Sequence, residues 1–186
     1  MVVKNELMKT VAIKTIGCKL NQYETQLIGE QFLRRGYRWV GFGEKADVYV
    51  INTCTVTARA DYSSRQAVSR ARRLTEESRT GANGSPLIVV TGCYAEVAPH
   101  RLSSLRGVDL VVGNDHKDRL AQIVEESSRM GWEPTRSIPS PPERNRSLAA
   151  SPPISGMRGY TRAFIRIQDG CNFSCSYCII PRARGS

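Results

Sequence analysis

The chain has 186 residues, of which 40% are hydrophobic and 24% are charged, and this predicts one globular domain and part of a second. Apolar runs such as Leu87–Val90 are too short to span a bilayer, and the polar first ten residues lack the apolar stretch of a signal peptide. We therefore expect a cytoplasmic protein with no membrane partner. A net charge of +10 favours a polyanionic partner such as nucleic acid, with a merely basic surface as the alternative.

The first 130 residues alternate between strand-like and helix-like patterns. Strands are predicted at 10–16, 37–40, 47–51, 87–91 and 108–112, and helices after Asn21, at 62–77, from Glu96 and at 115–130. Asn21 and Glu24 have the spacing of a capping box, which predicts that the first helix begins at Asn21. The alternation predicts an α/β fold for residues 1–130, with an open parallel sheet of the Rossmann or flavodoxin type.

The pattern stops at residues 131–160, which contain six of the nine prolines and which we interpret as a linker. Apolar residues then alternate over 162–168, which predicts a strand, and Asp169 and Gly170 lead into a cysteine-rich loop. Only 16 residues follow Gly170, whereas a (β/α) barrel takes about 250. We therefore expect residues 161–186 to be the first strand and loop of an incomplete barrel.

Three of the six cysteines, Cys18, Cys54 and Cys93, each follow a predicted strand. The carboxyl ends of parallel strands lie at one edge of a sheet, so three thiols delivered there can hold three irons of a cubic cluster. The fourth iron would remain open to another ligand. The alternative is that these cysteines are small buried hydrophobic residues.

The other three cysteines, Cys171, Cys175 and Cys178, have the spacing C-x3-C-x2-C and again supply three thiolates for four irons. A zinc site or a ferredoxin-type electron carrier would need a fourth ligand. The only histidines, His100 and His116, lie in the other predicted domain, and we assign neither a role.

This second loop, with an aromatic residue before its last cysteine, resembles the signature of the radical S-adenosylmethionine enzymes. The resemblance implies that Tyr177 lies against the adenine of S-adenosylmethionine, although packing beneath the loop would also explain an aromatic residue there. With both cysteine groups present, the chain is similar to the methylthiotransferases. That family implies an auxiliary [4Fe-4S] cluster on Cys18, Cys54 and Cys93. It implies a radical-generating [4Fe-4S] cluster on Cys171, Cys175 and Cys178, with an external electron donor.

Four stretches resemble the bacterial enzymes that act on N6-threonylcarbamoyladenosine in tRNA: GCKLNQYET (17–25), NTCTVT (52–57), IQDGCN (167–172) and CIIPRARG (178–185). The resemblance implies transfer of a methylthio group to C2 of this nucleoside, next to the anticodon. Since the family's barrel is incomplete here, we expect these 186 residues alone to be inactive. The alternatives are methylthiotransferases that act on isopentenyladenosine in tRNA or on an aspartate of a ribosomal protein, and a non-catalytic module that binds metal and RNA.

Six arginines follow Cys54 in the predicted helix and could contact tRNA phosphates. A solvated helix face is the alternative interpretation. They are Arg59, Arg65, Arg70, Arg72, Arg73 and Arg79.

Overall fold

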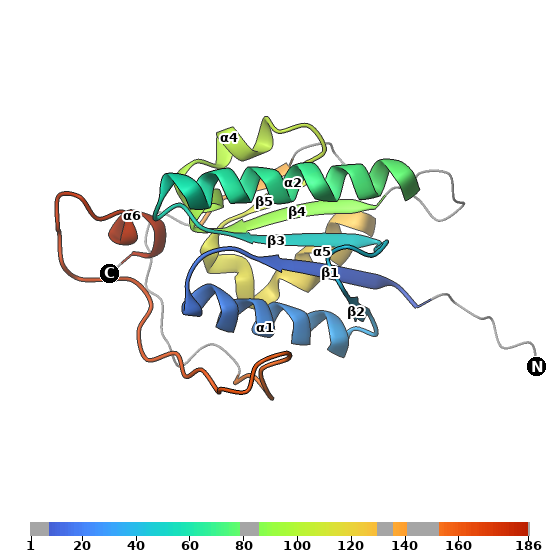
Figure 1. Cartoon of the computed structure of the whole chain (residues 1–186), viewed down its shortest axis with the longest axis horizontal. Coiled ribbons are helices and arrows are strands. Elements are labelled where there is room, and N and C mark those ends of the chain that lie inside the picture. The colour runs from blue at the N-terminus through green and yellow to red at the C-terminus, as the bar shows by residue number, and fades with distance from the viewer. Residues whose placement is uncertain (1–7, 79–85, 130–135, 141–152, 186) are drawn as a thin grey trace, which may run out of the picture.

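In a computed structural model, a six-stranded parallel sheet forms the centre of the protein (Figure 1). The structure describes residues 8–78, 86–129, 136–140 and 153–185. The strand order of the sheet is β2-β1-β3-β4-β5-β6, and all neighbouring strands run parallel. The strands are β1 (Thr10–Thr15), β2 (Arg38–Val40), β3 (Val48–Thr53), β4 (Leu87–Gly92), β5 (Leu110–Val112) and β6 (Arg136–Ile138). The expected α/β fold with an open parallel sheet is confirmed.

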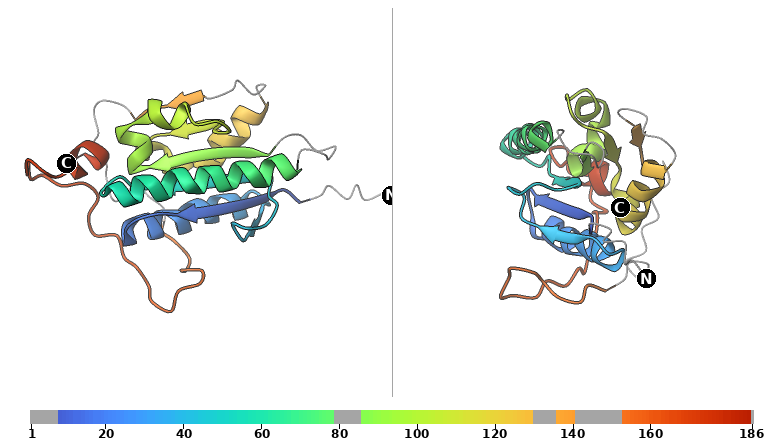
Figure 2. Two further views of the ribbon diagram at one scale, coloured as in Figure 1. Left: turned by 45° about the horizontal axis from the view of Figure 1, so that its top comes forward. Right: turned by 90° about the vertical axis from the view of Figure 1, so that its right-hand side faces the viewer.

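Helices cover both faces of this sheet (Figure 2). One face is covered by α1 (Lys19–Arg34) and α5 (Leu120–Arg129), the latter preceded by the 3-10 helix η1 (Asn114–Arg119). The other face is covered by α2 (Ala58–Ser78), α3 (Cys93–Val97) and α4 (Pro99–Ser103). The central strand β3 is buried along its whole length because it has helices on both sides.

The first helix does not begin at the predicted capping box. The helix α1 begins at Lys19, and Cys18 is its N-cap residue. Asn21 and Glu24 lie inside the helix with buried side chains, and both have partners elsewhere in the fold. The prediction of a cap is wrong here because the same local spacing fits two cases: a side chain that caps the helix, and a buried side chain whose partner lies far away in the sequence.

Part of the predicted linker joins the folded domain. Residues 136–138 form the edge strand β6, which pairs with β5. Further along, the Ser155 backbone N–H donates a hydrogen bond to Glu30 Oε1 at 2.8 Å, and the Arg158 guanidinium lies over the Trp39 ring. Composition missed β6 because a short edge strand is held by main-chain hydrogen bonds and needs few apolar side chains of its own.

The strand predicted at residues 162–168 does not form, since this segment joins no sheet in the described part of the chain. Ile165 and Ile167 are each 84% exposed. An alternating pattern becomes a strand only beside a hydrogen-bonding neighbour, and none of the strands that the structure describes pairs with this segment. The barrel itself stays a prediction.

No helix among the described residues combines the length and the apolarity that a membrane crossing requires.

Candidate functional site

The carboxyl edge of the sheet brings together the first three cysteines. Cys18, Cys54 and Cys93 follow β1, β3 and β4, which are direct neighbours in the sheet. Cys54 and Cys93 are buried, whereas Cys18 is exposed at the start of α1. Their role as cluster ligands stays a prediction, but the topology places them at adjacent strand ends.

Two glycines allow the strand ends to approach Cys54 closely. Gly17 has a φ of +103°, and a Cβ there would lie 2.7 Å from Cys54 Sγ. Gly92 has a φ of +102°, and a Cβ there would overlap the Thr53 carbonyl oxygen. Both positions need glycine for its backbone conformation and for space, so the turns that carry the thiols pack tightly against one another.

The thiol of Cys54 is buried and lies close to backbone N–H donors. Burial raises its pKa, and Cys93 and Cys18 raise it further, whereas hydrogen bonds from the backbone N–H groups of Val56 and Thr55 lower it. The effects of Cys93 and Cys18 on this pKa agree with their positions at the ends of the strands on either side of β3. Amide donors directed at a cysteine sulfur stabilise its thiolate form and tune bound iron–sulfur clusters.

A donor set of three sulfurs suits soft metals and iron–sulfur clusters. Cys93 is among the groups that raise the pKa values of Lys117 and Arg184, so these two positive charges lie near the Cys93 sulfur. Within the described ranges, no three His, Cys, Asp or Glu side chains are already placed to hold a metal ion. The residue types, their burial and the nearby positive charge fit a cluster at this edge.

The second cysteine group lies on a loop that is closed at its base. The Cys171 backbone N–H donates a hydrogen bond to the Gly185 carbonyl at 3.0 Å, and Gly170, with a φ of +84°, packs against that same carbonyl. Cys175 is exposed, and Tyr177 is 90% exposed. The middle of the loop is therefore accessible, while its two ends are joined.

A short helix, α6 (Ile180–Arg184), fixes this loop beside the carboxyl edge of the sheet (Figure 1). It packs against α3, whose first residue is Cys93. The Asn114 side-chain amide donates a hydrogen bond to the Ala183 carbonyl at 2.7 Å. The structure thus places both cysteine groups at the same end of the molecule.

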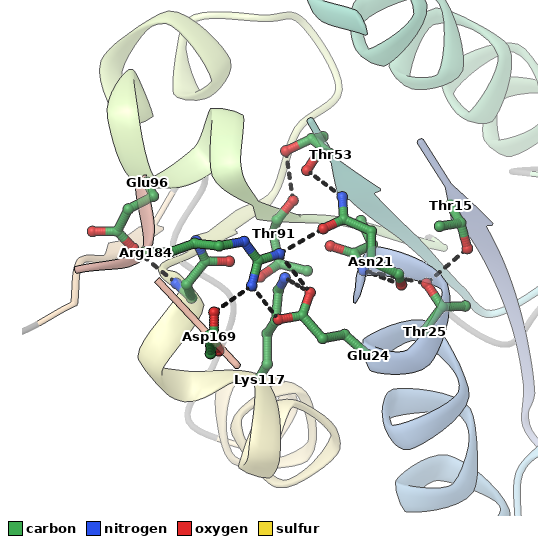
Figure 3. Close-up of polar contacts among 12 residues, drawn as sticks. Thr15, Asn21, Glu24, Thr25, Thr53, Thr91, Glu96, Lys117, Asp169 and Arg184 are labelled. Atoms are coloured by element: carbon green, nitrogen blue, oxygen red, sulfur yellow. Dashed lines mark hydrogen bonds and ion pairs between the residues drawn. The ribbon is translucent and has the colours of Figure 1, made fainter. Parts of the chain in front are cut away.

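Arg184 holds α6 in place through charged hydrogen bonds (Figure 3). Its Nη1 donates to Glu24 Oε1 and to Asp169 Oδ1, both at 2.8 Å, and its Nη2 donates to Glu24 Oε2 at 3.1 Å. Lys117 Nζ donates to the same Glu24 Oε2 at 2.5 Å. These four side chains are at most 4% exposed and form a buried cluster of two cations and two carboxylates.

Asn21 connects this charge cluster to the first cysteine group. Its Oδ1 accepts a hydrogen bond from Arg184 Nη2 at 2.6 Å, and its Nδ2 donates to the Ile16 carbonyl at 2.7 Å and the Thr53 carbonyl at 2.9 Å. Thr53 directly precedes Cys54, and Ile16 lies two residues before Cys18. One buried amide therefore joins the ends of β1 and β3 to Arg184.

The cluster shifts the pKa values of Glu24 and Arg184 in the directions that keep them charged, and it shifts the pKa of Lys117 in the opposite direction. Burial alone raises the pKa of Glu24, but Lys117 and Arg184 outweigh it and lower that pKa to about 2. Burial lowers the pKa of Arg184, but Glu24 outweighs it and the net shift is upward. For Lys117, burial dominates over the attraction of Glu24 and the pKa is lowered.

No role was predicted from the sequence for Lys117 or Arg184, whereas Asp169 was predicted in a turn and Asn21 and Glu24 in a helix cap. One signal was available. Glu24 is on the same helical face as Leu27 and Ile28, and a carboxylate on an apolar face needs a buried partner. The pattern does not say which cation that partner is.

Comparisons with known proteins identify a family and several similar chains. The model of the family described as "Uncharacterized protein family UPF0004" matches residues 10–113. The chain is 42% identical to "Threonylcarbamoyladenosine tRNA methylthiotransferase MtaB" of Aquifex aeolicus, over 94% of this chain and 40% of that protein. It is 40% identical to the protein of the same name from Bacillus subtilis, over 96% of this chain and 37% of that protein.

A relative with a different printed name is "tRNA-2-methylthio-N(6)-dimethylallyladenosine synthase" of Sorangium cellulosum. It is 32% identical over 96% of this chain and 36% of its own length. The chain spans about two fifths of the length of the curated relatives it matches.

We predict that Arg184→Met destabilises the protein by about 3–5 kcal/mol, because the buried carboxylates of Glu24 and Asp169 each lose a cationic partner at 2.8 Å. Denaturant unfolding measures the loss, and hydrogen exchange should show faster exchange in α6 and the cysteine loop. The control is Arg182→Met on the same helix, where the side chain is exposed and the expected loss is below about 1 kcal/mol. Equal losses in both variants would contradict the assignment.

We predict that Glu24 makes stability depend on pH in the acid range. Its pKa is about 2 in the folded protein against an ordinary value of 4.5, so its stabilisation is complete above pH 4.5 and is lost as pH falls through 2. The difference corresponds to about 3 kcal/mol. Urea unfolding between pH 2 and 5 should lose this component in Glu24→Gln and retain it in Glu126→Gln, an exposed control. The same pH profile in both variants would refute the role of Glu24.

Proposed function

Because the chain belongs to the protein family UPF0004, we propose that it acts in the methylthiolation of tRNA at N6-threonylcarbamoyladenosine. The named relatives from Aquifex aeolicus and Bacillus subtilis support this substrate, at higher identity than the relative named for dimethylallyladenosine. One observation carries the proposal. The loop of Cys171, Cys175 and Cys178 is fixed beside the strand ends of the first three cysteines, which suits a reaction that uses two sulfur-ligated centres in succession.

In this proposal Cys18, Cys54 and Cys93 hold one [4Fe-4S] cluster, and Cys171, Cys175 and Cys178 hold a second, with S-adenosylmethionine and Tyr177 beside the latter. When bound, these groups supply the one-electron chemistry that an unactivated carbon–hydrogen bond of adenine requires, because such a bond offers no acidic proton and no leaving group. The proposed substrate also implies a cytoplasmic location and an external electron donor.

In the proposed reaction, the chain's own residues bind the two clusters and fix the position of one relative to the other. Buried Cys54 and Cys93, with the amide donors of Val56 and Thr55, form a site from which water is largely excluded. Arg184 and Asn21 fix the distance between the two cysteine groups. Exposed Cys175 and Tyr177 leave the second loop open to a cofactor and a substrate. The inactivity of these 186 residues alone stays a prediction.

We predict about eight irons and eight acid-labile sulfides per chain after anaerobic reconstitution, because six thiols serve two four-iron clusters. Cys18→Ala and Cys171→Ala should each retain about four irons, and the loop control Ser176→Ala should retain all eight. Iron, sulfide and zinc analysis gives the result. Stoichiometric zinc without sulfide would overturn the proposal and favour the metal- and RNA-binding module.

We predict that deletion of the gene in the source organism abolishes the 2-methylthio derivative of N6-threonylcarbamoyladenosine in tRNA. The unmethylthiolated nucleoside should accumulate, because the modification that precedes this step is untouched. Mass spectrometry of tRNA nucleosides measures both, and a wild-type copy should restore the product where a Cys54→Ala copy does not. Loss of the isopentenyladenosine derivative instead would reassign the substrate, and unchanged tRNA would refute it.

A further inference from the structure

A groove of about 740 Å³ opens beside α2, on the face of the sheet opposite α1. It exists because α2 packs over β3 and β4 through Ala67, Val68 and Ala71, and so leaves the later part of β1, around Lys14, exposed on the same face (Figure 2). Ile16 and Phe42 contribute apolar surface to the groove. The topology thus leaves the groove open beside β1.

The lining of this groove is cationic. Lys14 of β1 and Arg70 and Arg73 of α2 line it with exposed side chains, and no Asp or Glu is among its described lining residues. Arg72 also lines it but is held by Glu76, with Arg72 Nε 3.6 Å from the carboxylate. Three exposed cations without a lining carboxylate form a surface complementary to a polyanion.

The groove leads toward the cysteines. Ile16 lines it two residues before Cys18, and Ser63 lines it in the first turns of α2, which begins shortly after Cys54. At this end Tyr62 is 55% exposed, and its hydroxyl accepts a hydrogen bond from Gln66 Nε2 at 2.8 Å. An exposed aromatic ring next to a row of cations is the arrangement on which unpaired bases stack while phosphates are neutralised.

We propose that this groove binds the phosphodiester backbone of RNA, with Lys14, Arg70 and Arg73 at phosphates and Tyr62 as a stacking surface at the cysteine end. The identification of the RNA as a tRNA anticodon arm rests on the proposed function, whereas the phosphate chemistry does not. Bound in this direction, a strand has one end at the edge where the cysteines lie.

The structure also reduces the set of arginines expected to contact RNA. Arg65 donates a hydrogen bond to the Tyr94 hydroxyl at 3.3 Å, and Arg72 pairs with Glu76. Arg79 lies outside the described residues. Arg70 and Arg73 line the groove, and Lys14 joins them from a strand far away in the sequence.

The test measures how tightly an unmodified anticodon stem–loop RNA binds to the full chain. Fluorescence anisotropy of the labelled RNA gives the affinity over a range of salt concentrations. The double variant Arg70→Glu/Arg73→Glu should bind at least about tenfold more weakly, and its salt dependence should fall by about two counterions. The matched control is Arg119→Glu/Arg129→Glu, which makes the same charge change at exposed positions on η1 and α5, on the opposite face of the sheet from the groove. Thermal unfolding of both variants checks that the fold is retained.

Retained affinity in the groove variant would overturn the proposal, and so would an equal loss in the control, since that would be an effect of net charge. Failure of the wild-type chain to bind the RNA at low salt would also overturn it. Tyr62→Ala should weaken RNA binding and leave binding of inorganic polyphosphate unchanged, because only RNA has bases to stack. Zinc in place of iron, together with groove-dependent RNA binding, would refute the proposed function and leave the groove intact.

Discussion

The arrangement of the site depends on the buried guanidinium of Arg184. Ala183 is the single buried hydrophobic residue that the structure describes between residues 153 and 185, so apolar burial contributes little to holding this part of the chain. Directional contacts to Glu24, Asp169 and Asn21 hold it instead. Removing four charges from water is costly, and the cluster is tolerable because each charge has an opposite partner. Such contacts define one position, whereas an apolar surface would permit sliding.

Parallel topology explains why the proposed cluster site and the end of the proposed RNA groove lie near one another. Every strand delivers its following turn to the carboxyl edge, and three adjacent strands deliver the first three cysteines. The helix that follows Cys54 then runs back mainly over β3 and β4, which leaves Lys14 of β1 exposed beside it and creates the cationic groove. The proposed cluster site and the proposed RNA site therefore have a common origin in the strand order.

Strand and helix placement followed closely from the sequence wherever burial was two-sided or strongly periodic. The segments around Val50 and Val89 are apolar and β-branched because helices cover both of their sides. The same reasoning failed where main-chain pairing or a missing neighbour decided the outcome. Arg136–Ile138 pairs at an edge with little apolar character, and residues 162–168 alternate without pairing.

The sequence by itself determined the parallel α/β architecture, the two groups of cysteines and their resemblance to methylthiotransferases, because periodicity and cysteine spacing are local properties. Only the tertiary structure decided what lies between the two groups. Glu24 and Arg184 are 160 residues apart, and Asn21 and Arg184 are 163 apart. A buried charge indicates locally that a partner must exist, but the choice of partner depends on how distant segments pack, and that information is present only in the folded chain.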